Sequence, residues 1–132
     1  MYSNSEWYIN LNKSNLTPPN WVFGVVWPIL YASIAAYYVL MILDTKCDGY
    51  CTPLIFFTVQ MFFNFLWPYL FFRRKEPLWA LLINGIMVLL TVITIYFTVV
   101  KHIIYGAIIT PYLLWICFAF YLNAYIVKNN QL

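Results

Sequence analysis

Amide and aromatic side chains recur at helical spacing within the longest apolar stretches of this chain. Gln60, Asn64 and Trp67 follow one another at i, i+4 and i+7, so they share one face of a helix. An amide in hydrocarbon is costly unless it is paired, so this face must point into a bundle or a cavity. Two interpretations stay open: hydrogen bonds between helices, and contacts with a ligand.

Two aromatic stripes could complete such a cavity. One stripe holds Trp27 and Tyr31 at i and i+4. The other runs at i, i+3, i+7 and i+10 and consists of Tyr112, Trp115, Ala119 and Leu122. Such stripes usually pack a core, but rings that face the amides, with space left at Ala119, would form a cavity. That cavity would suit a flat apolar ligand with a polar edge.

Other reactive side chains are few. No Lys, Arg, Asp or Glu lies within the long apolar stretches, which argues against a small proton-coupled exporter, since such a protein needs a titratable group in mid-membrane. We interpret His102 as an interfacial turn residue. Cys47 and Cys51 are close enough in the sequence for a disulfide to form between them, and the sequence leaves their state open. Two cysteine ligands are too few for a structural metal site, so no metal is expected.

Composition places these residues in a membrane protein. Of the 132 residues, 64% are hydrophobic, 22% are aromatic and 8% are charged, whereas a soluble domain has about 25% charged residues. Such a chain cannot cover its surface with polar groups, so a soluble domain and a disordered chain are both excluded. The net charge of +3 is spread thinly, and nucleic acid is not expected as a partner.

Four apolar stretches reach the length of about 20 residues that a membrane helix needs. They cover residues 21–43, 53–72, 78–100 and 103–127. We therefore predict an all-α integral membrane bundle with four transmembrane helices in a single domain, 1–132. A polar interfacial segment, 1–20, precedes them and has no signal-peptide core. Trp7 and Tyr8 on that segment are either an interfacial anchor or a flap over a pocket.

The charged connectors predict an orientation. With four spans, both termini lie on the same side as the turn after the second span. That side carries Lys13, Arg73, Arg74, Lys75 and Lys128, and the other side carries Lys46 and Lys101. The positive-inside rule therefore predicts that both termini are cytoplasmic.

Several motifs together resemble those of one family. Residues 18–31, PPNWVFGVVWPILY, are similar to the PPxWVFGPVWxxLY signature of the translocator proteins (TspO/MBR, the tryptophan-rich sensory proteins or peripheral benzodiazepine receptors). Residues 60–72 resemble the family's QLxLNxxWPxxFF, and residues 111–123 its PYLxWxxFAxxLN. Trp7-Tyr8 and Trp79-Ala80 match its WY and WA. The motifs cover most of the chain, from Trp7 to Asn123.

The resemblance implies a helical bundle that binds porphyrins, haem, benzodiazepine and isoquinoline carboxamide drugs and, in eukaryotes, cholesterol. By motif match, the ligand-binding residues are Tyr8, Trp27, Tyr31, Asn64, Trp67, Trp115, Ala119 and Leu122. Some members are reported to degrade protoporphyrin in light. The tryptophans that match the positions involved in that reaction are Trp27 and Trp115 here. Otherwise no catalytic residue is assigned. The family's sterol pattern is matched by Leu122, Tyr125 and Lys128. Porphyrin or haem would be a ligand, and no obligatory cofactor is expected.

Two departures from the family alter these expectations. The family has five spans, the first of which precedes the WY motif; we expect this chain to lack that span and to have an open wall beside its own first and fourth spans. Lipid, a partner chain or a second copy would cover it, and Ala32, Ala35 and Ala36 would allow close packing in a homodimer. In addition, Ile83 stands where the family usually carries Asp, and the adjacent Asn84 points in another direction.

Three functions follow from this sequence. The leading hypothesis is a receptor or sensor-like membrane protein that binds tetrapyrroles and other flat apolar ligands, with propionates toward a basic edge at Lys13. The second is a transporter or exchanger of tetrapyrroles or lipids. The third is a membrane assembly protein that binds no ligand.

Overall fold

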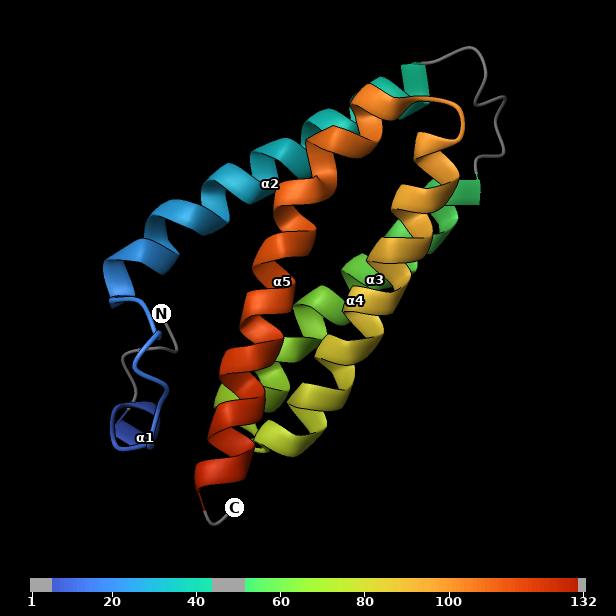
Figure 1. Ribbon diagram of the computed structural model, residues 1–132. Helices are drawn as coiled ribbons and strands as arrows, with labels where there is room; N and C mark the ends of the chain where they lie inside the picture. The colour runs from blue at the N-terminus through green and yellow to red at the C-terminus, as the bar shows by residue number, and fades with distance from the viewer. Residues whose placement is uncertain (1–5, 44–51, 131–132) are drawn as a thin grey trace.

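The computed structural model describes residues 6–43 and 52–130. Its elements are α1 (Glu6–Ile9), α2 (Asn20–Leu43), α3 (Thr52–Pro68), the π-helix η2 (Tyr69–Arg73), α4 (Pro77–Val99) and α5 (Ile103–Asn129) (Figure 1). Four helices are long and apolar enough to cross a membrane: α2, α3 continued by η2, α4 and α5. The described residues thus confirm the predicted all-α membrane bundle. Cys47 and Cys51 lie outside them.

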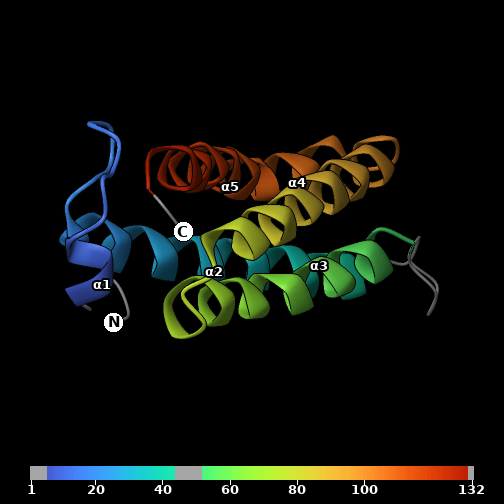
Figure 2. The same ribbon diagram turned by 90° about the horizontal axis from the view of Figure 1, so that it is seen from below.

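Successive long helices run in opposite directions (Figures 1 and 2). α4 packs against both α3 and α5, and α2 packs against α5. The N-terminal segment, the turn between η2 and α4, and the end of α5 therefore gather at one end of the bundle (Figure 1). That arrangement agrees with four crossings, whereas the cytoplasmic location of this end stays a prediction.

α2 and α5 pack together, so no opening lies between them, and an open wall beside these two helices stays a prediction. The loosely joined seam lies between α2 and α3. Within the described residues, the backbones of these two helices make fewer close contacts than those of α2 with α5, α3 with α4 or α4 with α5. Large side chains hold these two helices apart. Tyr31 stacks on Phe65, and Tyr38 stacks on Phe57 and shares a 3.0 Å hydrogen bond with Thr58.

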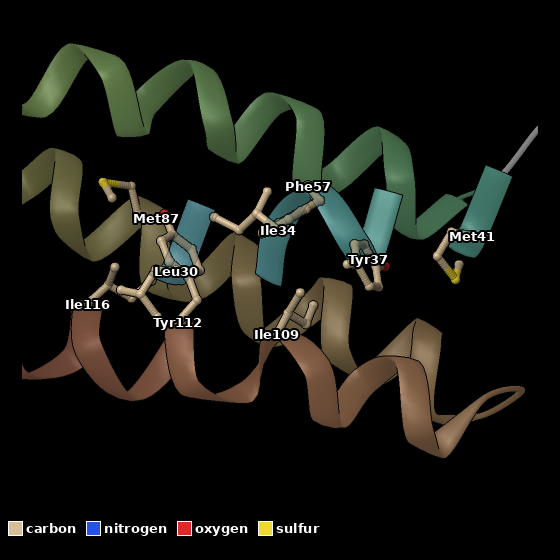
Figure 3. Packing of buried hydrophobic residues seen from close by; sticks show 9 residues of the cluster. All are labelled: Leu30, Ile34, Tyr37, Met41, Phe57, Met87, Ile109, Tyr112 and Ile116. Carbon is tan, nitrogen blue, oxygen red and sulfur yellow. The ribbon is translucent and has the colours of Figure 1, made fainter. Parts of the chain in front are cut away.

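A buried core joins all four long helices in the part of the bundle away from the termini. α2 contributes Leu30, Ile34, Tyr37 and Met41 at alternating steps of four and three residues, so they share one face. They point toward side chains from the other three helices: Phe57, Met87, Ile109, Tyr112 and Ile116 (Figure 3). The exposed face of α2 carries Ala32, Ala35 and Ala36, and the homodimer through them stays a prediction.

Proline and glycine set the turns between helices. Pro68 has no N–H to donate within α3, and the helix continues as the π-helix η2. η2 ends before Lys75, whose φ of 55° lies in the left-handed region. Where α5 begins close to the end of α4, a Cβ on Gly106 would collide with the side chain of Val99.

Candidate functional site

A cavity of about 310 Å³ lies between the first half of α2, the end of α3 with η2, the first half of α4 and the second half of α5. Tyr8, ahead of α2, also contributes to its wall. All the residues to which the sequence assigned ligand binding line this cavity: Tyr8, Trp27, Tyr31, Asn64, Trp67, Trp115, Ala119 and Leu122. The fold thus brings them to one place, and their binding of a ligand stays a prediction.

Aromatic rings close the side of the cavity between α2 and α5. The ring of Trp115 meets Trp27 edge-on, with 6.2 Å between centroids, and meets Phe23 in the same way at 5.6 Å. On the opposite side, Trp67 stacks on Phe71 with centroids 4.9 Å apart. Because each indole is supported by another ring, the wall is preorganised and offers broad flat faces.

Hydrogen bonds tie the amide face of α3 to its neighbours. The Tyr31 hydroxyl donates to Asn64 Oδ1 at 2.9 Å, and Asn64 Nδ2 donates to the Tyr112 hydroxyl at 2.7 Å. Gln60 Nε2 also donates to Tyr112. Gln60 is fully buried and is not part of the cavity wall. The amide face therefore serves helix packing, and only Asn64 and Trp67 of the original three reach the cavity.

Two further amides hold the wall in place. Trp67 Nε1 donates to Asn123 Oδ1 at 3.1 Å, and Asn123 Nδ2 donates to the Pro77 carbonyl at 3.0 Å. The Asn84 side chain is assigned the amide orientation in which both of its polar atoms have partners. In this orientation its nitrogen donates to the Ile116 carbonyl and its oxygen accepts from the Phe120 N–H, both on the α5 backbone. Both Asn84 and Asn123 also line the cavity.

The indole N–H of Trp115 is the exception among the polar groups of the wall. It is buried, and no described residue accepts a hydrogen bond from it. A buried donor without an acceptor is uncommon in a folded protein and calls for an explanation. Trp115 lines the cavity, but its Nε1 is closed to a water-sized molecule, so an acceptor on a bound molecule would reach this N–H only after the indole moves.

The segment before α2 covers the end of the cavity nearest the termini. The ring of Tyr8 is buried and packs edge-on against Phe71 and Phe72. Lys13 Nζ donates to the Tyr8 carbonyl at 2.8 Å and lies 4.7 Å from the centre of the Tyr8 ring. Burial raises the pKa of Tyr8 and lowers the pKa of Lys13. Tyr8 thus has the position of a flap, and Lys13 is linked to the cavity through it.

The segment is fastened to α5 by polar contacts. The Asn130 amide accepts from the Asn12 N–H at 3.0 Å and donates to the Asn12 carbonyl at 3.1 Å. The hydroxyls of Ser14 and Tyr121 lie 3.2 Å apart. These contacts hold Tyr8 over the end of the cavity without a covalent link.

The sterol-pattern residues do not share one environment. Leu122 lines the cavity, whereas Tyr125 and Lys128 do not. Tyr125 is half-buried and Lys128 is exposed near the end of α5. Sterol binding by this pattern stays a prediction. In the described part of the chain, no group of three His, Cys, Asp or Glu side chains could hold a metal ion.

Sequence reasoning missed about half of the cavity wall. The additional residues are Phe23, Pro68, Phe71, Phe72, Asn84, Met87, Ile116, Asn123 and Ile126. Six of these lie within the quoted motif ranges, so the motifs carried a signal for them: Phe23, Pro68, Phe71, Phe72, Ile116 and Asn123. Met87 carried none, because an apolar residue of a membrane helix can equally face lipid, a neighbouring helix or a cavity.

Comparison with known proteins gives a consistent picture. Residues 1–128 match the TspO/MBR family. The chain is 37% identical to the tryptophan-rich protein TspO of Archaeoglobus fulgidus, over 94% of this chain and 80% of that protein. It is 35% identical to the tryptophan-rich sensory protein of Cereibacter sphaeroides, over 95% and 77% of the two chains.

The human translocator protein is 31% identical, over 96% of this chain and 76% of its own length. The family match extends through the segment with Tyr8 and all four long helices. The chain is therefore an integral membrane protein that belongs to the TspO/MBR family.

Proposed function

We propose that this protein is a membrane receptor that binds a tetrapyrrole, such as protoporphyrin IX or haem, in the aromatic cavity. The observation that carries the proposal is that all eight residues assigned to ligand binding line one cavity, among them Trp115, whose buried indole N–H has no partner within the described residues. A donor of this kind gains a hydrogen bond when a ligand brings an acceptor, such as a ring nitrogen or a carbonyl oxygen, into the cavity.

The shape of the cavity supports a flat, largely apolar ligand. Trp27, Trp67 and Trp115 offer ring faces and edges against which a macrocycle can stack. The volume of about 310 Å³ is at the lower end of the range for ligand sites. A tetrapyrrole would therefore project in part from the cavity. Its propionates would favour the end with Tyr8, because Lys13 and the basic turn after η2 lie at that end.

A titration tests this proposal. Protoporphyrin IX is added to the purified protein in mild detergent, and the quenching of tryptophan fluorescence is followed. Ala119→Phe would fill space at the cavity wall, whereas Ala107→Phe adds the same ring to an exposed position of the same helix. We expect saturable binding by the unaltered protein and by Ala107→Phe, and binding at least tenfold weaker by Ala119→Phe. Equal binding by the two variants would contradict the proposal.

An exchanger of tetrapyrroles is the second candidate, favoured by the partial exposure of Tyr31 on the cavity wall. It predicts ligand-dependent movement of porphyrin between vesicles, which a receptor alone would not produce. Light-dependent loss of porphyrin absorbance that requires Trp27 and Trp115 would add a degradative activity. The absence of any saturable binding would favour an assembly protein instead.

A further inference from the structure

We infer that residues 73–75, the basic turn between η2 and α4, bind the headgroup of an anionic phospholipid of the surrounding membrane. The inference concerns the outer surface of the bundle and does not depend on ligand binding in the aromatic cavity. The class of ligand is a glycerophospholipid whose headgroup carries a net negative charge, of which phosphatidylglycerol is a simple representative.

The net charge of the chain belongs to the end of the bundle that holds this turn. Five of the seven Lys and Arg residues, and two of the four acidic residues, belong to the N-terminal segment, the basic turn and the end of α5. The connections between α2 and α3 and between α4 and α5 hold two basic and two acidic residues, whose charges cancel. The end with the basic turn therefore carries the whole net charge of +3, which attracts anionic headgroups.

The backbone holds the basic turn in one shape. The Arg74 N–H donates to the Tyr69 carbonyl at 2.9 Å, and the Glu76 N–H donates to the Leu70 carbonyl at 3.0 Å. Between these two bonds, φ of Lys75 is 55°, so the chain reverses sharply there. All three residues of the turn are exposed. The turn thus presents three adjacent cations on a backbone that is already ordered.

The charge of this turn is available to an outside partner. Within the described residues, neither Arg74 nor Lys75 forms an ion pair with an acidic side chain. A guanidinium binds two phosphate oxygens at once, and an ammonium adds a compact point charge beside it. The pair therefore matches the phosphodiester of a lipid headgroup.

The turn also lies at the depth of lipid headgroups. One span ends at Arg73 and the next begins at Pro77, so the turn sits just outside the hydrocarbon core. The flanking Tyr69 and Trp79 are 50% and 58% exposed, as is typical of aromatic residues at a membrane interface, and Leu78 is exposed between the turn and Trp79. A phospholipid meets cations with its headgroup and these apolar side chains with its acyl chains, whereas free phosphate meets only the cations.

The test uses the full chain in mild detergent and two lipids with the same acyl chains, dioleoyl phosphatidylglycerol and dioleoyl phosphatidylcholine. Native mass spectrometry measures the dissociation constant of each lipid. Lys75→Asn removes one charge, and Asn tolerates the left-handed φ at this position. Lys101→Gln, the matched control, removes one exposed charge at the opposite end of the bundle. A double variant, Arg74→Gln with Lys75→Asn, removes two charges from the turn, and thermal unfolding checks that each variant is folded.

We expect the unaltered protein to bind phosphatidylglycerol more tightly than phosphatidylcholine. Lys75→Asn should weaken phosphatidylglycerol binding about fivefold, and the double variant about tenfold or more. Lys101→Gln should bind it as the unaltered protein does. An excess of inorganic phosphate should leave phosphatidylglycerol bound, because phosphate gains nothing from the apolar side chains beside the turn.

Equal affinities for the two lipids would overturn the inference, and so would equal binding of phosphatidylglycerol by Lys75→Asn and Lys101→Gln. Displacement of phosphatidylglycerol by inorganic phosphate would overturn it as well, since the turn would then be a site for free phosphate. The single variants decide the outcome if the double variant fails to fold. The porphyrin titration tests the proposed function separately, so the two can fail independently.

Discussion

The unpartnered indole N–H makes Trp115 the most informative position for substitution. Trp115→Phe keeps an aromatic ring in the wall and removes only the donor and part of the ring face. If a ligand accepts a neutral hydrogen bond from this donor, its loss costs about 0.5–1.5 kcal/mol, which is about a twofold to tenfold loss of affinity. We expect this loss in a protoporphyrin IX titration followed by tryptophan fluorescence.

The stability of Trp115→Phe should change little. A buried donor without an acceptor destabilises the folded protein by about 1–3 kcal/mol. Removing this donor therefore offsets the stability that is lost because phenylalanine buries less apolar surface than tryptophan. We therefore expect the free energy of unfolding to change by less than about 1 kcal/mol. Thermal unfolding followed by circular dichroism in the same detergent measures it.

Two other tryptophans provide matched controls. Trp67→Phe leaves Asn123 Oδ1 without its donor, so it should lower stability by about 1–2 kcal/mol. Trp79 is 58% exposed and does not line the cavity, so Trp79→Phe should affect neither stability nor binding. The reasoning is refuted if Trp115→Phe binds porphyrin as the unaltered protein does, or if it loses as much stability as Trp67→Phe.

Three further results are expected. Lys75→Gly should raise stability by about 0.5–1 kcal/mol in thermal unfolding, because φ at this position is 55°; a lower melting temperature would contradict this. Gly106→Ala should cost about 1–3 kcal/mol, since its Cβ has no room, whereas Gly24→Ala has open space and should not be destabilising. A reporter fused after Leu132 should be cytoplasmic and a tag inserted within residues 44–51 should lie on the opposite side; finding both on one side would refute four crossings.

The membrane bundle followed from the sequence because its physical cause is local. A helix that crosses a bilayer needs a long stretch without charge, and nothing else in the chain has to be known to recognise it. The helical spacing of Asn64 with Trp67, and of Trp27 with Tyr31, is equally local. It fixes which side chains share a face of one helix, and so it could indicate residues that now line one cavity.

The neighbours of each helix could not be read from the chain. In lipid no hydrophobic force selects a partner face, so packing detail decides which helices touch. The sequence did not show which helices adjoin α2, whereas in the structure the interlocked rings of Trp27, Phe23 and Trp115 join α2 to α5, and Tyr31 with Phe65 spans the looser seam between α2 and α3.

Hydrogen-bond partners were also decided only by the tertiary structure. From the sequence, Gln60 and Asn64 were equivalent amides on one face, yet Gln60 is enclosed beside Tyr112 while Asn64 reaches the cavity. Trp67 and Trp115 were likewise equivalent rings, but among the described residues only Trp67 finds an acceptor, because Asn123 lies opposite its indole nitrogen. A donor and its acceptor come from helices far apart in the chain, so their meeting depends on packing that no local pattern encodes.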